Sequence, residues 1–171
     1  TRLESGAIIP NAGLCDVSEV VGSALNRAQA ILRHHRLEIE LAPDLPMLSI
    51  DPVLFEQALF NLLDNAAKYA PEGSLVRIEG WSDGAFVTLA VLDEGPGIAA
   101  EDRERLFDKF YRGRKGDQVR PGTGLGLGIS RGFLEAMGGT LTADGRPDRR
   151  GAAFTIRMPV PPQARALKAL P

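Results

Sequence analysis

The sequence predicts an α+β fold, a two-layer α/β sandwich in which one mixed, mostly antiparallel sheet carries helices on one face. Segments 16–33 and 51–69 repeat apolar residues at helical spacing. Segments 75–81 and 86–92 alternate apolar and polar residues, and the Asp83-Gly84 pair between them is a strong hairpin signal. Helices and hairpin-connected strands in this order do not show the regular alternation of a doubly wound fold.

The predicted helices have recognisable ends. Asp16 and Glu19 form a capping box at the start of helix 16–33. Asp51 stands at the N-cap of the next helix, and Pro52 occupies its first position. Further helices are expected at 100–107 and 130–137, the latter stopped by Gly138-Gly139.

Other short segments complete the sheet. Strict alternation predicts a strand at 37–41, and extended chain is expected at 47–50. A closing antiparallel pair is expected from 141–143 and 153–158. The Pro- and Ala-rich residues after 158 are expected to be frayed.

Composition is that of an ordinary globular domain. The 171 residues are 44% hydrophobic and 25% charged, with a net charge of −2, which gives no reason to expect a nucleic-acid partner. The single cysteine, Cys15, excludes an internal disulfide. The chain begins without Met, so a piece of a longer protein is expected. We divide it into a linker at 1–11 that ends a preceding helix, a domain at 12–160 and a flexible tail at 161–171.

Residues 93–128 form the centre of the predicted site. This stretch has glycine-rich ends at 93–98 and 122–128, and the basic, polar segment 112–121 between them has no apolar period. Glycines let backbone N–H groups approach a phosphate, and a helix that starts at the second cluster would direct its positive end there. A flexible surface loop is the alternative. The alternating leucines of 122–128 favour a mobile lid over a ligand.

Three polar side chains follow one stripe of helix 51–69. Asn61, Asn65 and Lys68 lie at i, i+4 and i+7. A solvated helix surface is the alternative, but asparagine is a weaker helix former than the residues usual on such a surface. An amide oxygen can ligate Mg²⁺, and a lysine one turn further can meet a phosphate. The stripe therefore favours a metal–triphosphate ligand.

Two more side chains have chemistry that suits a nucleotide. Asp93 ends an apolar strand, where a carboxylate needs donors such as the exocyclic amine of a purine. Capping of the turn at Gly95 is its alternative role. Arg112 can offer a guanidinium to phosphate, whereas Phe107 and Phe110 are interpreted as a hydrophobic anchor for the base of the lid.

Four segments resemble the N, G1, F and G2 boxes of the histidine-kinase ATP-binding domain, and they occur in the family order: 61–69, 93–98, 106–112 and 122–130. The resemblance covers about residues 14–160 and implies the Bergerat fold, with ATP bound beneath the lid and Mg²⁺ on Asn65. Segments 20–27, 107–113 and 138–147 are also similar to the sensor kinases of bacterial high-affinity potassium uptake.

The resemblance also implies roles for individual residues. Asp93 would read adenine, with Tyr69 and Ile98 beside the base or sugar. Asn61, Lys68 and Arg112 would act in phosphoryl transfer, the last two by contacting phosphates. Thr155 would reach adenine through water. The glycine-rich and lid positions implied to contact the nucleotide are Gly95, Gly97, Phe110, Gly122, Thr123, Gly124, Leu125 and Gly126.

One departure from the family bears on function. Histidine kinases phosphorylate a histidine on a preceding helical hairpin, but His34 and His35 do not match its motif. We expect the acceptor histidine to lie outside this chain, in a bacterial parent protein that is homodimeric and anchored in the membrane. This domain would lie in the cytoplasm, and a response regulator would be the partner of the parent. The fragment itself is expected to be monomeric. An ATPase of the gyrase, Hsp90 and MutL group is the alternative, although those enzymes carry glutamate at the position of Asn61. A nucleotide-sensing module without chemistry is a third.

Overall fold

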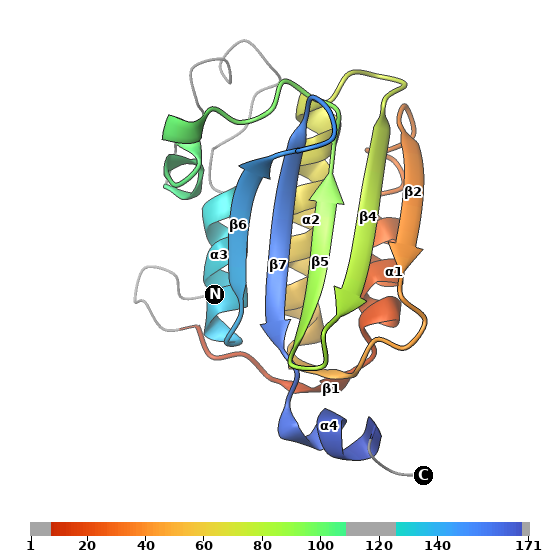
Figure 1. Ribbon diagram of the computed structural model, residues 1–171, viewed down its shortest axis with the longest axis vertical. Coiled ribbons are helices and arrows are strands. Elements are labelled where there is room, and N and C mark those ends of the chain that lie inside the picture. Colours follow the sequence, from red (N-terminus) through yellow and green to blue (C-terminus); the bar gives the residue numbers. More distant parts are fainter. Residues whose placement is uncertain (1–7, 109–125, 169–171) are drawn as a thin grey trace.

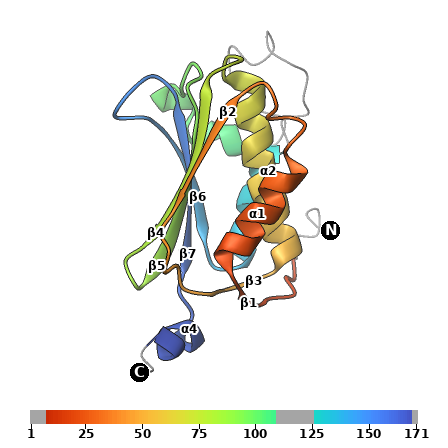
Figure 2. The same cartoon turned by 90° about the vertical axis from the view of Figure 1, so that its right-hand side faces the viewer.

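The computed structural model describes residues 8–108 and 126–168 (Figure 1). A five-stranded sheet has the order β2-β4-β5-β7-β6, in which β2 and β4 run parallel and every other neighbouring pair is antiparallel. The helices cover one face of this sheet, and its other face is open (Figure 2). The predicted two-layer α+β fold is confirmed. The strands are β2 (Arg36–Leu41), β4 (Leu75–Ser82), β5 (Phe86–Leu92), β6 (Thr140–Gly145) and β7 (Ala152–Pro159).

Three helices form the second layer: α1 (Val17–Arg27), α2 (Pro52–Tyr69) and α3 (Gly126–Ala136). The central helix, α2, lies along the middle of the sheet between the other two (Figure 1). One whole face of α2 is buried against the strands, and the core includes side chains from every layer. Its fully buried large members include Phe55, Leu59, Leu62, Leu63, Ile78, Leu89, Leu134 and Ile156.

Helix α1 is shorter than the sequence predicts. It begins at the expected cap, where Asp16 accepts a hydrogen bond from the Ser18 N–H, but it ends at Arg27 and the chain continues in turns through residue 34. Ala28 and Leu32 in these turns are still buried. The apolar spacing therefore outlasts the helix, and periodicity alone cannot locate where the helix stops.

Three other segments differ from expectation. Residues 100–107 form two 3₁₀ turns, η2 (Ala100–Asp102) and η3 (Arg105–Phe107), and no continuous helix. A strand that the sequence does not predict, β1 (Gly13–Cys15), pairs antiparallel with β3 (Leu48–Ile50). Part of the expected frayed tail is a short helix, α4 (Pro162–Lys168), because buried Ala164 anchors it to the core.

Among the described residues, no helix has the length and apolar character needed to cross a bilayer.

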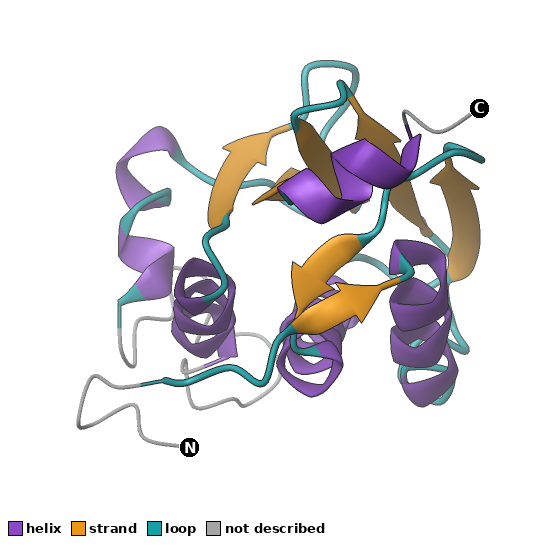
Figure 3. Cartoon of the chain, turned by 90° about the horizontal axis from the view of Figure 1, so that it is seen from below, coloured by secondary structure: helices purple, strands orange, loops and turns teal. Residues whose placement is uncertain are grey.

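The small sheet of β1 and β3 lies at the lower end of the molecule and leads directly into α2 (Figure 3). Asp51 caps the helix as predicted, with Oδ1 accepting from the N–H groups of Val53 at 3.0 Å and Leu54 at 3.3 Å. Its Oδ2 accepts from the Asn11 N–H at 2.8 Å. One carboxylate therefore satisfies the helix terminus and fixes the incoming N-terminal segment.

Replacement of this cap is expected to destabilise the fold. Asp51→Ala removes the acceptors for three backbone N–H groups and should lower the free energy of unfolding by about 1–2 kcal/mol in urea titrations. Asp51→Asn is the matched control, because its amide oxygen retains the contacts to the helix, and it should lose less. Equal stability of Asp51→Ala and wild type would contradict this account of the cap.

Candidate functional site

The candidate site lies at the upper end of the sheet, where Asp93 follows the last residue of β5. The Asp93 N–H donates to the Ala152 carbonyl, and its Oδ1 accepts from the N–H groups of Gly95 at 2.8 Å and Ala152 at 3.3 Å. The residue is only 3% exposed. Burial raises the pKa of this carboxyl, and the two backbone donors and the charge of Arg146 oppose that rise. Its Oδ2 accepts no hydrogen bond from a described residue, which leaves it available to a ligand.

The turn after Asp93 packs closely against the end of α2. A Cβ on Gly95 would lie 2.9 Å from the Tyr69 carbonyl oxygen, so only glycine allows this approach. Gly97 has a φ of 85°, in the left-handed region that favours glycine. Ile98 follows and packs against the core, while Tyr69 is half-buried. The structure thus brings Asp93 and Gly95 to the C-terminal end of α2, and Gly97 lies against the backbone of Gly151.

The α2 stripe contains three side chains in different states. Asn61 joins two helices, since its Nδ2 donates to the Gly126 carbonyl at 3.2 Å and to Ser130 Oγ at 3.0 Å. Lys68 is paired with Asp64 one turn earlier, at 3.0 Å. Asn65 is half-buried, and its side chain forms no hydrogen bond with a described residue. Its amide is therefore the member of the stripe that is available to a metal.

The donor set fits Mg²⁺ held largely through a nucleotide. Mg²⁺ prefers hard oxygen ligands and usually keeps several waters beside one or two protein ligands. Asn65 offers one such oxygen. Within the described ranges there is no group of three His, Cys, Asp or Glu side chains that would make a cage for a metal. These residues suit a metal–triphosphate better than a metal bound by protein alone.

The two ends of the predicted lid lie against each other. A Cβ on Gly128, in the first turn of α3, would be 2.6 Å from the carbonyl oxygen of Phe107 in η3. Buried Phe107 also lies beneath the Arg131 guanidinium, at 4.7 Å from the ring centroid. Gly126 is held by Asn61. The other predicted lid positions lie outside the described residues: Phe110, Arg112, Gly122, Thr123, Gly124 and Leu125.

The expectation for Thr155 is wrong. Along β7, buried Phe154 and Ile156 face the helices, so Thr155 between them faces the open side of the sheet. It pairs there with Ala90 and Thr142. Asp93 pairs with Ala152, two residues before Phe154, and belongs to the helix side. The sheet therefore separates Thr155 from the carboxylate that it was expected to assist.

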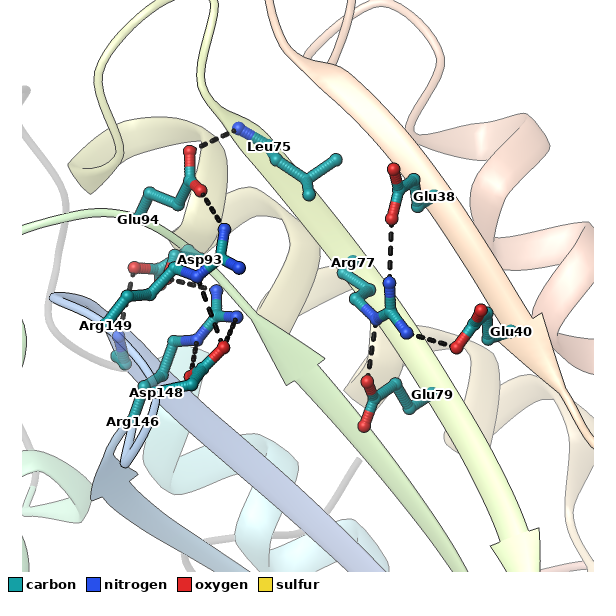
Figure 4. A network of polar contacts seen from close by, with 11 residues as sticks. Glu38, Glu40, Leu75, Arg77, Glu79, Asp93, Glu94, Arg146, Asp148 and Arg149 are labelled. Atoms are coloured by element: carbon teal, nitrogen blue, oxygen red, sulfur yellow. Dashed lines mark hydrogen bonds and ion pairs between the residues drawn. The ribbon is translucent and has the colours of Figure 1, made fainter.

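A charged network that the sequence does not predict surrounds Asp93 (Figure 4). Arg146 donates to the Asp93 carbonyl, and Arg149 pairs with Glu94, both from the turn between β6 and β7. The only signal in the sequence is a run of polar residues in that turn, which is typical of any exposed loop. A second cluster in the same figure, Arg77 with Glu38, Glu40 and Glu79, lies on the open face of the sheet, apart from the site.

Comparison with known proteins identifies the class. The model of the histidine kinase-, DNA gyrase B- and HSP90-like ATPase family matches residues 50–162. The chain therefore belongs to this family, whose members share an ATP-binding domain. Among solved structures, the mycobacterial sensor histidine kinase MprB superposes with a TM-score of 0.77 at 30% identity, covering 86% of this chain and 97% of that one.

More specific similarity is to sensor kinases. The sensor protein KdpD of Escherichia coli K12 is 39% identical over 158 residues, which cover 92% of this chain and 17% of KdpD. The sensor-like histidine kinase SenX3 of Mycobacterium bovis is 36% identical over 161 residues, or 93% of this chain and 39% of SenX3. The chain thus corresponds to a minor part of each relative. It is an ATPase-family domain of the kind that these sensor histidine kinases contain.

The buried carboxylate of Asp93 predicts a measurable effect of pH on stability. Because its folded-state pKa is raised above 3.8, the folded state keeps this proton to higher pH than the unfolded state does. Stability from this group is present at low pH and falls as pH rises above about 3.8 through the raised value. Asp93→Asn keeps the Oδ1 acceptor without the charge, so at pH 7 it should be as stable as wild type or more stable.

Urea titrations of both proteins between pH 4 and pH 7 measure this difference. The stability of wild type relative to Asp93→Asn should decline across the range. A variant that is clearly less stable than wild type at pH 7 would show that the charge of Asp93 stabilises the fold.

Proposed function

We propose that this domain binds ATP with Mg²⁺ and transfers the γ-phosphoryl group to a histidine on a separate helical hairpin of its parent protein. The observation that carries the proposal is that two available groups, the Asp93 Oδ2 and the Asn65 amide, both lie near the C-terminal half of α2. The full-length kinase ShkA, whose structure holds AMPPNP, resembles this chain at 27% identity with a TM-score of 0.78, which supports nucleotide binding.

In this proposal, Asp93 and its neighbours bind the adenosine part of ATP, and the α2 stripe binds Mg²⁺ and the phosphates. Asp93 accepts a hydrogen bond from the adenine amine, with Tyr69 and Ile98 beside the base or sugar. Asn65 holds Mg²⁺, which when bound offsets the negative charge of the phosphates. Lys68 moves from Asp64 to a phosphate oxygen, a small exchange because the Lys68–Asp64 pair is partly exposed. Arg112 and the glycines of 122–126 complete the phosphate contacts.

The state of Asn61 favours transfer to histidine over hydrolysis. Its amide is neutral, and it donates to Gly126 and Ser130 while its Oδ1 accepts from Gln57. A side chain committed to these contacts is a poor general base for water. We assign Asn61 to holding α3, and with it the end of the lid, against α2. Asn61 would then support the site without acting as a general base. This role distinguishes the domain from ATPases of the same family, which carry glutamate at that position.

The remaining parts of the proposal concern the parent protein. Because the chain spans 17% of KdpD and 39% of SenX3, the acceptor hairpin, the homodimer and the response regulator are proposed from similarity to these kinases. A role in potassium or osmotic sensing rests on the similarity to KdpD alone. The need for ATP favours a location on the cytoplasmic side of an anchored bacterial protein.

Nucleotide binding should be selective for adenine. The 6-amine of adenine donates to Asp93, whereas guanine places an oxygen at that position, so two acceptors would face each other. Loss of this hydrogen bond costs about 1–3 kcal/mol, which is about a 5- to 150-fold rise in Kd. Titration calorimetry with Mg-ATP and Mg-GTP measures the ratio. Equal affinity for the two nucleotides, or unchanged ATP affinity of Asp93→Asn, would exclude this role.

Phosphoryl transfer should require a second chain. The isolated domain is expected not to label itself from γ-labelled ATP, and the histidine-bearing hairpin of the parent, added in trans, should become phosphorylated slowly. Asn65→Ala should abolish labelling because the metal ligand is lost. His34→Ala is the matched control and should leave labelling unchanged. Rapid ATP turnover by the domain alone would favour the ATPase alternative, and label on His34 or His35 would move the acceptor into this chain.

A further inference from the structure

The turn between β6 and β7 folds back over the backbone of Asp93. From this turn, Nη1 of Arg146 donates to the Asp93 carbonyl at 3.1 Å. The Arg146 side chain is only 4% exposed although it carries a charge. Its Nε and Nη2 donate to the two carboxylate oxygens of Asp148 at 3.1 Å and 3.0 Å. The guanidinium is therefore held in one plane by Asp148 and presents its remaining nitrogen to Asp93 (Figure 4).

Gly151 makes this close approach possible. A Cβ at that position would overlap the Asp93 carbonyl oxygen, and its φ of 143° belongs to the region that favours glycine. The Gly151 carbonyl accepts from the Arg146 N–H at 3.2 Å, so the turn closes on itself. The Asp93 N–H is bonded to Ala152 in the adjoining strand. Both backbone polar groups of Asp93 are thus fixed by the β6–β7 turn and the start of β7.

A second arginine of the β6–β7 turn, Arg149, contacts Glu94, the residue after Asp93. Arg149 pairs with the Glu94 carboxylate at 2.8 Å and with Asp148 at 3.2 Å. The other carboxylate oxygen of Glu94 accepts from the Leu75 N–H at 3.0 Å. The Arg149 side chain is 49% exposed and contacts no atom of Asp93 in these pairs. It fastens the turn to the protein without touching the base-reading residue.

We propose that Arg146 is a positioning residue for nucleotide specificity, which fixes the Asp93 backbone and so aims Oδ2 at the exocyclic amine of the bound purine. The proposal rests on the adenine-reading role of Asp93 proposed above. Since Asp148 compensates the charge of Arg146, the contribution of the pair is to orientation more than to net potential. Rotation of the Asp93 peptide would turn the carboxylate with it, and the Arg146 hydrogen bond opposes that rotation.

The test compares two ligands that differ by one amine. Calorimetry gives Kd for Mg-ATP and for the Mg complex of purine riboside triphosphate, which lacks the 6-amine, on the full chain. Wild type should favour ATP by about five-fold or more, the value of one hydrogen bond. Arg146→Met should weaken ATP binding and bring the ratio of the two Kd values toward one, with little change for the analogue. A loss of folding or of general packing would weaken both ligands equally.

Arg149→Met is the matched control. It removes the other arginine of the turn, so the ratio of the two Kd values should stay at the wild-type value even if both affinities fall. Arg146→Lys should restore part of the preference, because an ammonium can donate to the Asp93 carbonyl without the two-point contact to Asp148. If circular dichroism shows that Arg146→Met does not fold, Asp148→Asn, which loosens the guanidinium, should lower the ratio partially.

The outcomes separate the two proposals. A wild-type protein that binds ATP and the analogue equally would overturn the adenine-reading role of Asp93 and this inference with it. A wild-type preference that survives unchanged in Arg146→Met, or in Asp148→Asn where the first variant does not fold, would overturn the role of Arg146 alone. A preference lost equally in Arg149→Met would show that the whole turn acts as a brace, which also contradicts a specific role for Arg146.

Discussion

Burial of one face of α2 sets the geometry of the site. Seven residues along this helix are buried, so its rotation about its own axis is fixed by the hydrophobic effect. A turn of 100° would expose this face and bury the polar stripe, at a cost of many kcal/mol by the usual value of about 25 cal/mol per Å² of apolar surface. The positions of Asn61, Asn65 and Lys68 follow from the packing of the seven buried residues of the same helix.

The same helix connects the two ends of the molecule. Its first turn is capped by Asp51, which also holds the N-terminal segment through Asn11. Its last turn ends at Tyr69, where the chain after β5 packs on the helix through Gly95. The long helix thus fixes how the proposed metal ligand, Asn65, and the proposed purine-reading carboxylate, Asp93, lie relative to each other.

At Asp93, the requirements of ligand binding and of folding stability oppose each other. A buried carboxylate is costly, and the fold compensates only part of that cost with two N–H groups on one oxygen. Satisfaction of both oxygens by the protein would suit stability better, but it would leave no acceptor for a base. The available Oδ2 is therefore an acceptor unpaired by any described residue, which a nucleotide amine would satisfy in the proposed role of Asp93.

Local signals in the sequence predicted the elements that depend on local chemistry. The cap and length of α2 and the hairpin at Gly84 followed from residues close together in the chain. The end of α1 did not, because Ala28 stays buried after the helix stops. β1 is three residues long and owes its conformation to its pairing with β3.

The candidate site shows the same division. Asn65 and Asp93 belong to recognisable motifs, whereas Arg146 acts on a residue 53 positions earlier and no local pattern indicates that contact. For Thr155 the correct face was readable from the apolar alternation of Phe154, Ile156 and Met158. The alternation predicts the face of this residue directly, whereas the resemblance implies only a residue type.

The dependence of Asp93 on the β6–β7 turn has a consequence for how the domain acquires its ligand affinity. Contacts that join residue 93 to residues 146 and 152 form only after the chain has closed a long loop, and such closures come late in folding. A chain that has formed α2 and the β4–β5 hairpin possesses the proposed metal ligand, Asn65, but its proposed purine acceptor, Asp93, is not yet oriented. If adenine nucleotide binds the completed domain alone, as proposed, mass action would favour the formed β6–β7 pair by about 2.7 kcal/mol at a ligand concentration one hundred times Kd. In a cell rich in ATP, the proposed ligand would then also protect the C-terminal strands of the domain from opening.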